Sequence, residues 1–419
     1  MSGARDAHGQ ADLREPDLPR SAKVRTGPMR TGWTTGTCAA AAAKAAVAAL
    51  VTGEPQDEVD VPLPSGRRVT FPVKRCEPLR SSGSQGTLHG DGRWQAVVVK
   101  DAGDDPDCTH GAELTATVLW TVEPGVTLER GEGVGIVTKP GLGLEVGAPA
   151  INPVPRRMIS EAIREVLSLD AYGVEITISV PGGEHMAKKT TNRRLGILGG
   201  ISILGTSGIV RPFSTASWRA SVLQAVDVMS AQGEETCVLT TGGRTERAAR
   251  RMLPALPEVC FVEVGDFSGA ALERAASRGL RQVLFVGMVG KLAKLGAGVM
   301  MTHWTRSRVD ADYLGEVTLR AGGDERLVAA VRAANTARHT YELWTEAGLV
   351  AKAAGLLCTD VARNLADWAE RRLEVQAVLV DFDSLEPVAT SVGYESGLGA
   401  GAGRGLPKTA GGRGRGGGC

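Results

Sequence analysis

Short apolar runs separated by polar turns dominate the first half of the chain, and this pattern predicts strands. The strand-like runs are residues 58–63, 68–73, 95–100, 113–120, 133–138 and 174–180. The first two flank Pro64-Ser65-Gly66, a turn signal, so they are predicted to form a hairpin. An alanine-rich helix is predicted from Thr35 to Val51, and further helices from Pro153 to Leu167 and from Ser217 to Met229. Strands in succession with few helices predict an α+β domain with a mixed sheet.

The pattern changes after about Ala231, where short apolar runs alternate with helical stretches. Strands are predicted at residues 237–241, 259–264, 282–286 and 375–380, and helices at 245–253, 268–278, 288–295, 325–338 and 349–371. This alternation predicts a parallel sheet with right-handed crossovers, and we expect an α/β Rossmann-like domain.

The pattern therefore predicts two folded domains, an α+β domain at residues 25–230 and an α/β domain at residues 231–385. The segments outside them, residues 1–24 and the Gly/Arg-rich residues 386–419, are expected to be disordered. Sequence of this composition cannot bury enough apolar surface to offset the loss of backbone entropy.

Composition and charge narrow the function classes. The formal net charge is +1 and only 4% of the 419 residues are aromatic, which disfavours nucleic-acid binding. The seven cysteines are scattered and have no metal-ligand spacing, so neither a metal site nor a disulfide framework is expected. No segment has the pattern of a signal peptide or a membrane span, and we expect a cytoplasmic protein that does not bind membranes. A homo-oligomer is compatible with this composition.

A Gly/Thr-rich segment leads directly into the alanine-rich helix, and it contains Thr34, Thr35 and Thr37. Such a turn can direct unpaired backbone N–H groups and hydroxyls at a carboxylate or phosphate, helped by the helix dipole. The alternative is a plain N-cap in which a threonine satisfies the first turn and the glycines only shape the bend. The residues alone leave both interpretations open.

An acidic loop at residues 100–111 follows a predicted strand and combines four aspartates with one histidine. Asp101, Asp104 and His110 are candidate catalytic residues, because such a cluster can place a general base beside a carbon that loses a proton. The loop could also bind a hard cation, although it lacks the spacing of an EF-hand. The remaining alternative is an acidic turn whose aspartates cap backbone N–H groups.

Glycine is frequent within apolar sequence at residues 131–153 and 181–208, which indicates tight turns or backbone pressed against a ligand. Basic residues lie close by in both segments. Lys139, Asn152 and Arg156 are the candidate substrate-binding residues here, since arginine binds carboxylates bidentately and this region suits a large flat ligand with several carboxylates. Taken singly, each basic residue is more often a solvated surface charge.

Two strand-to-helix junctions in the second half are candidate cofactor sites, because ligands of open parallel sheets bind beyond the carboxyl ends of the strands. The first contains Thr241, Gly242 and Gly243, and the second contains Gly287. Glu263 and Asp266, near the end of the strand between them, could accept hydrogen bonds from ribose hydroxyls. Neither junction matches a nucleotide-binding fingerprint, and ordinary turn glycines with solvent-facing acids remain the alternative.

Four segments, in this order, resemble the cobalt-precorrin-5B C1-methyltransferase family of the anaerobic cobalamin pathway. They are residues 31–43, 100–111, 138–157 and 195–210, and the resemblance extends from about Arg30 to Val380. It implies transfer of a methyl group from S-adenosylmethionine to C1 of the macrocycle, which yields cobalt-precorrin-6A. The partner is then a small-molecule corrinoid, whose cobalt belongs to the substrate. The resemblance also implies a fold distinct from the other tetrapyrrole methylases.

Two further functions remain as alternatives. A nucleotide-dependent kinase or ligase would use the turn at Thr34 to Thr37 as its phosphate cradle and would consume ATP. A corrinoid carrier would bind the macrocycle without affinity for S-adenosylmethionine.

Overall fold

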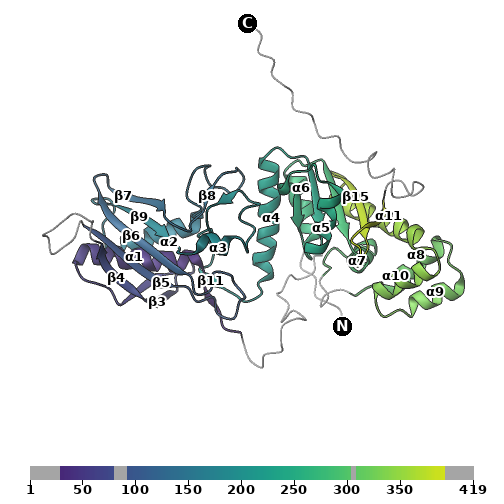
Figure 1. The fold of residues 1–419 in the computed structure, drawn as a ribbon, viewed down its shortest axis with the longest axis horizontal. Helices are drawn as coiled ribbons and strands as arrows, with labels where there is room; N and C mark the ends of the chain where they lie inside the picture. The colour runs from purple at the N-terminus through teal and green to yellow at the C-terminus, as the bar shows by residue number, and fades with distance from the viewer. Residues whose placement is uncertain (1–28, 80–91, 303–307, 392–419) are drawn as a thin grey trace, which may run out of the picture. The chain divides into compact units, whose positions relative to one another are not determined.

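The computed structural model describes residues 29–79, 92–302 and 308–391 (Figure 1). They form two compact units that divide between Trp218 and Arg219, whereas the sequence pattern placed the division near Ala231. The difference concerns helix α4 (Thr215–Ala231), whose Asp227 pairs with two arginines at the end of helix α6 (Ser268–Ser277). Most of α4 therefore belongs to the second unit. The expected disorder of residues 1–24 lies outside the described residues.

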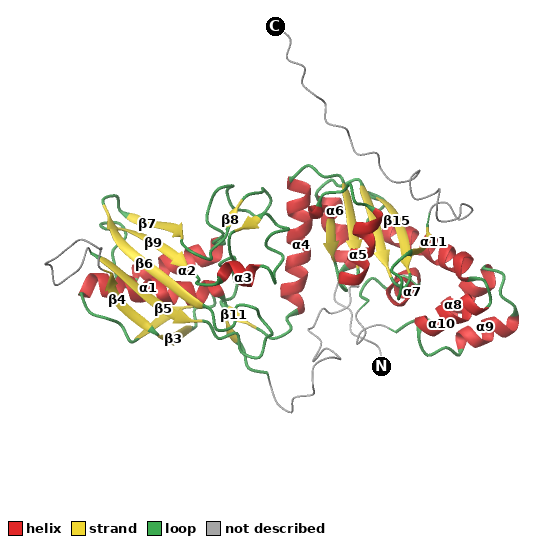
Figure 2. Ribbon diagram, viewed as in Figure 1, coloured by secondary structure: helices red, strands yellow, loops and turns green. Residues whose placement is uncertain are grey.

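The first unit is built on a five-stranded mixed sheet, which confirms the expected sheet type (Figure 2). In spatial order its strands are β4 (Arg75–Leu79), β5 (Arg93–Val99), β6 (Glu113–Thr121), β9 (Gly173–Ser179) and β7 (Gly125–Arg130). The β7–β9 pair is parallel and the other pairs are antiparallel. The predicted hairpin is also confirmed, as strands β2 (Glu58–Pro62) and β3 (Arg68–Pro72).

Helix α1 (Thr35–Thr52) lies in the core of this unit, between the sheet and helix α2 (Pro153–Arg164). Its alanine side chains are almost all fully buried, and their small size lets the helix approach the sheet closely. The helix ends at Gly53, whose φ of +75° gives the left-handed C-cap that the glycine predicted. By length and composition α1 is the one helix of the described residues that could span a membrane. It is 83% buried, as is typical of a core helix.

The glycine-rich segments form short elements beside this core: strands β1 (Gly32–Trp33), β8 (Ile136–Val137), β10 (Ile197–Leu198) and β11 (Ile209–Val210), and helix α3 (Gly183–Ala187). The strand expected at residues 133–138 is reduced to β8. A Cβ on Gly133 would lie 1.9 Å from the Val180 carbonyl oxygen, and one on Gly200 would lie 2.2 Å from the Gly133 carbonyl oxygen. These glycines are therefore required where backbone segments of the protein touch one another.

The second unit contains a five-stranded sheet in the order β13-β12-β14-β15-β16. The strands are β12 (Thr236–Thr240), β13 (Phe261–Glu263), β14 (Gln282–Gly287), β15 (Glu374–Val380) and β16 (Pro387–Thr390). The first four are parallel, as predicted, and β16 is antiparallel to β15. The order differs from the 3-2-1-4-5-6 order of the Rossmann fold, so that finer expectation is not confirmed. The disorder expected from residue 386 was wrong for Pro387–Thr390, because this segment forms β16 and completes the sheet. The rest of that expectation, from residue 392, lies outside the described residues.

Helices connect these strands. They are α5 (Gly243–Met252), α6, α7 (Val289–Gly296), α8 (Ala311–Arg320), α9 (Glu325–Arg332), α10 (Ala337–Glu346) and α11 (Val350–Trp368), with a 3₁₀ turn at Glu258–Cys260. The prediction of a single helix at residues 325–338 was wrong about where that helix ends. It ends at Arg332, and Thr336 begins α10 by accepting a hydrogen bond from the His339 amide.

Candidate functional site

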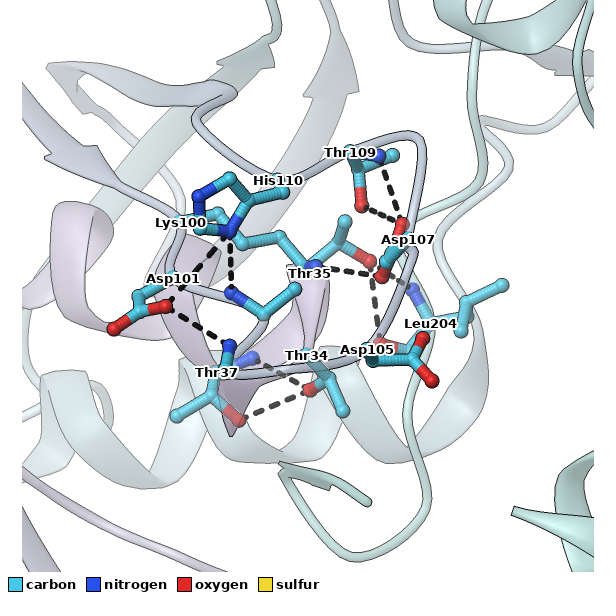
Figure 3. A network of polar contacts seen from close by, with 12 residues as sticks. Thr34, Thr35, Thr37, Lys100, Asp101, Asp105, Asp107, Thr109, His110 and Leu204 are labelled. Atoms are coloured by element: carbon cyan, nitrogen blue, oxygen red, sulfur yellow. Dashed lines mark hydrogen bonds and ion pairs between the residues drawn. The ribbon is translucent and has the colours of Figure 1, made fainter. Parts of the chain in front are cut away.

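The entry of α1 joins segments that are far apart in the sequence (Figure 3). Thr34 is the N-cap residue, and its hydroxyl accepts from the Thr37 amide at 3.2 Å. The Thr37 hydroxyl donates to the Gly208 carbonyl at 2.7 Å, and the Thr35 hydroxyl accepts from the Leu204 amide at 2.9 Å. All three threonines are buried. The geometry matches the N-cap interpretation, so any contribution of these hydroxyls to ligand binding acts through the loop that they hold.

The acidic loop is folded around a buried ion pair. The Lys100 ammonium, 1% exposed, donates to the Asp107 carboxylate at 2.7 Å. Asp107 also accepts from the Thr109 amide at 2.8 Å and from the Thr109 hydroxyl at 2.6 Å. Burial raises the pKa of Asp107, but Lys100 and the Thr109 donors outweigh burial, so its pKa lies below the usual value. Part of the acidic cluster is therefore structural, as in the acidic-turn interpretation.

Two other carboxylates of the loop hold Arg30. The Asp101 carboxylate pairs with the Arg30 guanidinium and accepts from the Gly103 amide, and the Asp104 carboxylate accepts from the Arg30 amide at 2.8 Å. A Cβ on Gly103, whose φ is +68°, would lie 2.2 Å from the Arg30 carbonyl oxygen. Hydrogen bonds from Arg30 and Gly103 keep the pKa of Asp101 below its usual value. A carboxylate stabilised as an anion is a weak base, which argues against Asp101 as the proton acceptor.

His110 presents its imidazole beside the same loop, with its side chain 56% exposed. Its Nδ1 accepts a hydrogen bond from the Ala102 amide at 3.1 Å. Nδ1 also lies 3.8 Å from the Asp101 carboxylate, a longer contact that would need a proton on Nδ1. The hydrogen bond from the Ala102 amide is shorter than the contact with Asp101, so Nδ1 acts as the acceptor. In the neutral ring the proton is therefore on Nε2. In this form His110 can donate a hydrogen bond from Nε2 to a ligand.

The three candidate residues of the glycine-rich segments lie in one part of the first unit. Strand β8 pairs with β10, and Ile151 bridges to Ile203, which brings the segments of Lys139, Asn152 and Arg156 together. Arg156 donates from Nε to a backbone carbonyl at 2.8 Å, which fixes its guanidinium. Asn152 is the N-cap residue of α2 but its side chain makes no capping hydrogen bond. Asn152 and Arg156 thus lie at the start of α2, and Lys139 lies beside Gly196 in the loop after β8.

In the second unit, two of the expected loops touch. Thr241, Gly242 and Gly243 link β12 to α5, and Gly287 ends β14. A Cβ on Gly287 would lie 3.5 Å from Thr241 Cγ2. The chain leaves β12 towards β13 and leaves β14 towards β15, so these neighbouring strands form the topological switch point at which open sheets bind ligands. A Cβ on Gly242 or Gly243 would meet no described atom within 4 Å, so the backbone here is open to approach.

The loop after β13 is tied to the same place by Lys291, a residue that the sequence interpretation did not select as a site. Its ammonium donates to the carbonyls of Thr241 at 3.1 Å and Gly265 at 2.8 Å, and it lies 3.3 Å from the Asp266 carboxylate. Glu263 ends β13 in register with Thr240 of the neighbouring strand. A lysine in the first turn after a buried parallel strand was the available signal, but only the fold identifies its partners.

The described residues contain no group of three or more His, Cys, Asp or Glu side chains arranged to hold a metal ion. Cys38 lies in the alanine tract, and burial raises the pKa of its thiol to about 12. It is therefore a small buried side chain and not a reactive thiolate.

Comparisons with known proteins agree across the chain. Residues 22–212 match the CbiD family model, and residues 301–391 match the model of the CbiD C-terminal domain. A Rubrobacter xylanophilus protein named cobalt-precorrin-5B C(1)-methyltransferase is 64% identical over 91% of this chain and 96% of its own length. A Salinispora arenicola protein of the same name is 64% identical over 90% of this chain and 97% of its own length.

One solved structure also matches, the cobalamin biosynthesis protein cbiD from Archaeoglobus fulgidus. It is 29% identical and the alignment covers 66% of this chain and 83% of that protein, with a TM-score of 0.34.

Proposed function

This chain belongs to the CbiD family, and from this premise we propose that it methylates C1 of cobalt-precorrin-5B. It is a methyltransferase of cobalamin biosynthesis. The observation that supports this function best is 64% identity over 91% of the chain to a relative of that name, of which the chain covers 96%. The relatives match at nearly full length, so both units take part in the likeness.

We propose S-adenosylmethionine as the methyl donor and cobalt-precorrin-6A as the product. When bound, S-adenosylmethionine supplies a methyl group on a positively charged sulfur. The C1 carbon forms the new bond, the S–CH₃ bond breaks, and its electron pair stays on the sulfur of S-adenosylhomocysteine. The nucleophile belongs to the substrate, so the protein contributes alignment and the exclusion of water.

The donor fits the loops after β12, β13 and β14. The backbone at Gly242 and Gly243 is open, and the N-terminus of α5 presents backbone N–H groups to an anionic group such as the donor carboxylate. Asp266 and Glu263 supply carboxylates for ribose hydroxyls, and Gly287 borders the same loops. This assignment is supported by the switch point of the sheet, where the loops of two adjacent strands diverge.

The corrinoid fits the first unit, where basic and amide side chains lie near the start of α2. Arg156 and Lys139 suit the acidic side arms of the macrocycle, and Asn152 can donate to them as well. Thr34, Thr35 and Thr37 support this site through the loop that they hold, because their hydroxyls are used within the protein.

Among the candidate catalytic residues, His110 is the best placed to contact the substrate. Its Nε2 donor can bind a carboxylate or polarise an electron-rich ring atom, because Nδ1 is held by the Ala102 amide. Asp101 and Asp104 position the loop through Arg30. On this assignment, replacing Asp104 with alanine lowers activity through the loop and not through loss of a base.

The test is transfer of a labelled methyl group. Purified full-length chain is incubated without oxygen with cobalt-precorrin-5B and S-adenosylmethionine that carries a ¹³C methyl group. The proposal expects one ¹³C methyl at C1 of the product and an equal amount of S-adenosylhomocysteine. ATP consumption without label in the corrinoid would instead indicate a kinase or ligase. Corrinoid binding without label transfer and without affinity for S-adenosylhomocysteine would indicate a carrier.

A further inference from the structure

The Lys291 ammonium lies where three loops meet at the carboxyl edge of the second-unit sheet. Lys291 is in the first turn of α7, directly after β14. Its ammonium donates hydrogen bonds to the Thr241 carbonyl, in the loop after β12, and to the Gly265 carbonyl, in the loop after β13. It also forms an ion pair with Asp266 of the second loop. Two of the three N–H donors of the lysine are used by these carbonyls, and the charge of the ammonium is paired with Asp266. Lys291 therefore connects the loops and is not a spare cation for a ligand.

The Asp266 carboxylate is held from two directions. The Thr302 hydroxyl donates to its Oδ1 at 2.9 Å, and the Lys291 ammonium lies 3.3 Å from the same oxygen. Both of these contacts, which are the ones that the Asp266 carboxylate makes with residues 29–79, 92–302 and 308–391, involve Oδ1. Within these described residues Oδ2 accepts no hydrogen bond, so it keeps its acceptor capacity on a carboxylate that is oriented through Oδ1.

We infer that Lys291 is a positioning residue for the methyl donor. It orients the Asp266 carboxylate and the adjacent Gly265 carbonyl to accept hydrogen bonds from the two hydroxyls of a ribose. This inference rests on the proposed function, since the ribose is that of S-adenosylmethionine. Lys291 acts through Asp266 and Gly265, because its ammonium is already engaged by groups of the protein.

The same ammonium also fixes the loop that begins at Thr241. Its bond to the Thr241 carbonyl restrains the backbone just before Gly242 and Gly243, where the protein is open to a ligand. Lys291 thereby fixes the position of the ribose acceptors relative to the open glycine backbone. Lys294, one turn later on α7, differs: it is buried and donates to the Thr302 carbonyl at 2.9 Å, which is a packing role.

The experiment measures binding of S-adenosylhomocysteine to the full-length chain by isothermal titration calorimetry. The variants are Lys291→Met, which keeps most of the side-chain length but removes the donors, Lys291→Arg, and Asp266→Asn. Lys352→Met, at an exposed lysine of α11, is the matched control. We expect Lys291→Met and Asp266→Asn each to weaken binding by about tenfold or more, because each removes a charged hydrogen-bond partner. Lys291→Arg keeps the charge and should lose less.

The double variant distinguishes positioning from independent contacts. If Lys291 acts largely through Asp266, the loss of affinity in the double variant Lys291→Met/Asp266→Asn is smaller than the product of the two single losses. The remaining difference from Asp266→Asn reports the bond to the Thr241 carbonyl. Steady-state kinetics of Lys291→Met should show a raised KM for the donor, with kcat and the KM for the corrinoid within about threefold of the unaltered chain. A general structural defect would change all three constants.

Wild-type affinity in Lys291→Met, losses that multiply in the double variant, or a changed corrinoid KM would overturn the inference. If Lys291→Met does not fold, Asp266→Asn and Lys291→Arg decide it: full affinity in Asp266→Asn refutes the inference, and the expected losses in both support it. Failure of the proposed function looks different, because the unaltered chain then neither binds S-adenosylhomocysteine nor transfers the methyl label.

Discussion

The buried pair of Lys100 and Asp107 supports the loop that carries His110, and its removal is a quantitative test of the site. Lys100→Met deletes an ammonium that is 1% exposed and, among the described residues, leaves Asp107 with the Thr109 donors alone. Loss of one partner of a buried ion pair costs about 3–5 kcal/mol. Because the Asp107 side chain is 24% exposed, water compensates part of this cost. We expect a loss of about 2–3 kcal/mol in the free energy of unfolding.

Urea unfolding followed by circular dichroism measures this loss. With an m value of about 3 kcal/mol/M, the midpoint should fall by about 0.7–1 M. The chain has two compact units that can unfold separately, so the transition must be assigned to the first unit. Hydrogen exchange in peptides of β5 and β6, which flank the loop, provides that assignment and should be faster in the variant.

The effect also depends on pH in a defined direction. The folded-state pKa of Asp107 lies below its usual value of 3.8, so the pair contributes stability above that pH. The contribution is lost as the pH falls through the folded-state pKa. The difference between Lys100→Met and the unaltered chain should therefore narrow below about pH 4.

Replacement of both partners provides the control. Lys100→Met combined with Asp107→Leu leaves no unpaired buried charge, and it should recover part of the loss. The reasoning is refuted if Lys100→Met costs less than about 1 kcal/mol at pH 7. A double variant less stable than Lys100→Met would refute it as well.

Three further changes test other parts of the structure. Thr37→Val removes a buried hydroxyl that donates to the Gly208 carbonyl at 2.7 Å, and thermal denaturation should show a loss of about 1–3 kcal/mol. Glu165→Gln removes a carboxyl whose pKa, usually 4.5, is lowered to about 2 by Arg68 and a neighbouring lysine. Glu165 therefore stabilises the fold above pH 4.5, and urea unfolding should show the difference between variant and unaltered chain vanishing as the pH falls to about 2. Gly287→Ala places a Cβ 2.9 Å from a leucine methyl group of α7, so calorimetry should show weaker binding of S-adenosylhomocysteine. Unchanged stability in the first, a pH-independent difference in the second, or unchanged affinity in the third would contradict these expectations.

Elements with a strong local signal were predicted well. Helix α1 begins at Thr35 as expected and ends one residue beyond the predicted Val51, because alanine favours helix and Gly53 can adopt the left-handed cap. Strand β7 was missed because only two apolar residues, Val126 and Leu128, alternate with polar ones, which is too short a pattern to predict a strand. Its position depends on parallel pairing with β9, a contact that no local pattern encodes.

The candidate site shows the same division. The acidic loop and the loops after β12 and β14 were predicted from the sequence, since turns and glycines have local signatures. The hydrogen bonds of these segments could not be predicted. Thr37 donates to the Gly208 carbonyl, and Lys291 donates to the Thr241 carbonyl. These bonds decided that the threonines support a loop and that the lysine connects loops.

The sequence by itself determined the family, the chemical class of the reaction and the elements whose propensities and turns are local. The tertiary structure decided the strand order of the second unit, the internal use of the threonine and aspartate side chains, and the place of Lys291. The physical reason is the range of the interactions. Helix propensity and capping act within a few residues, whereas a buried hydroxyl or ammonium takes whichever partner the fold brings within about 3 Å.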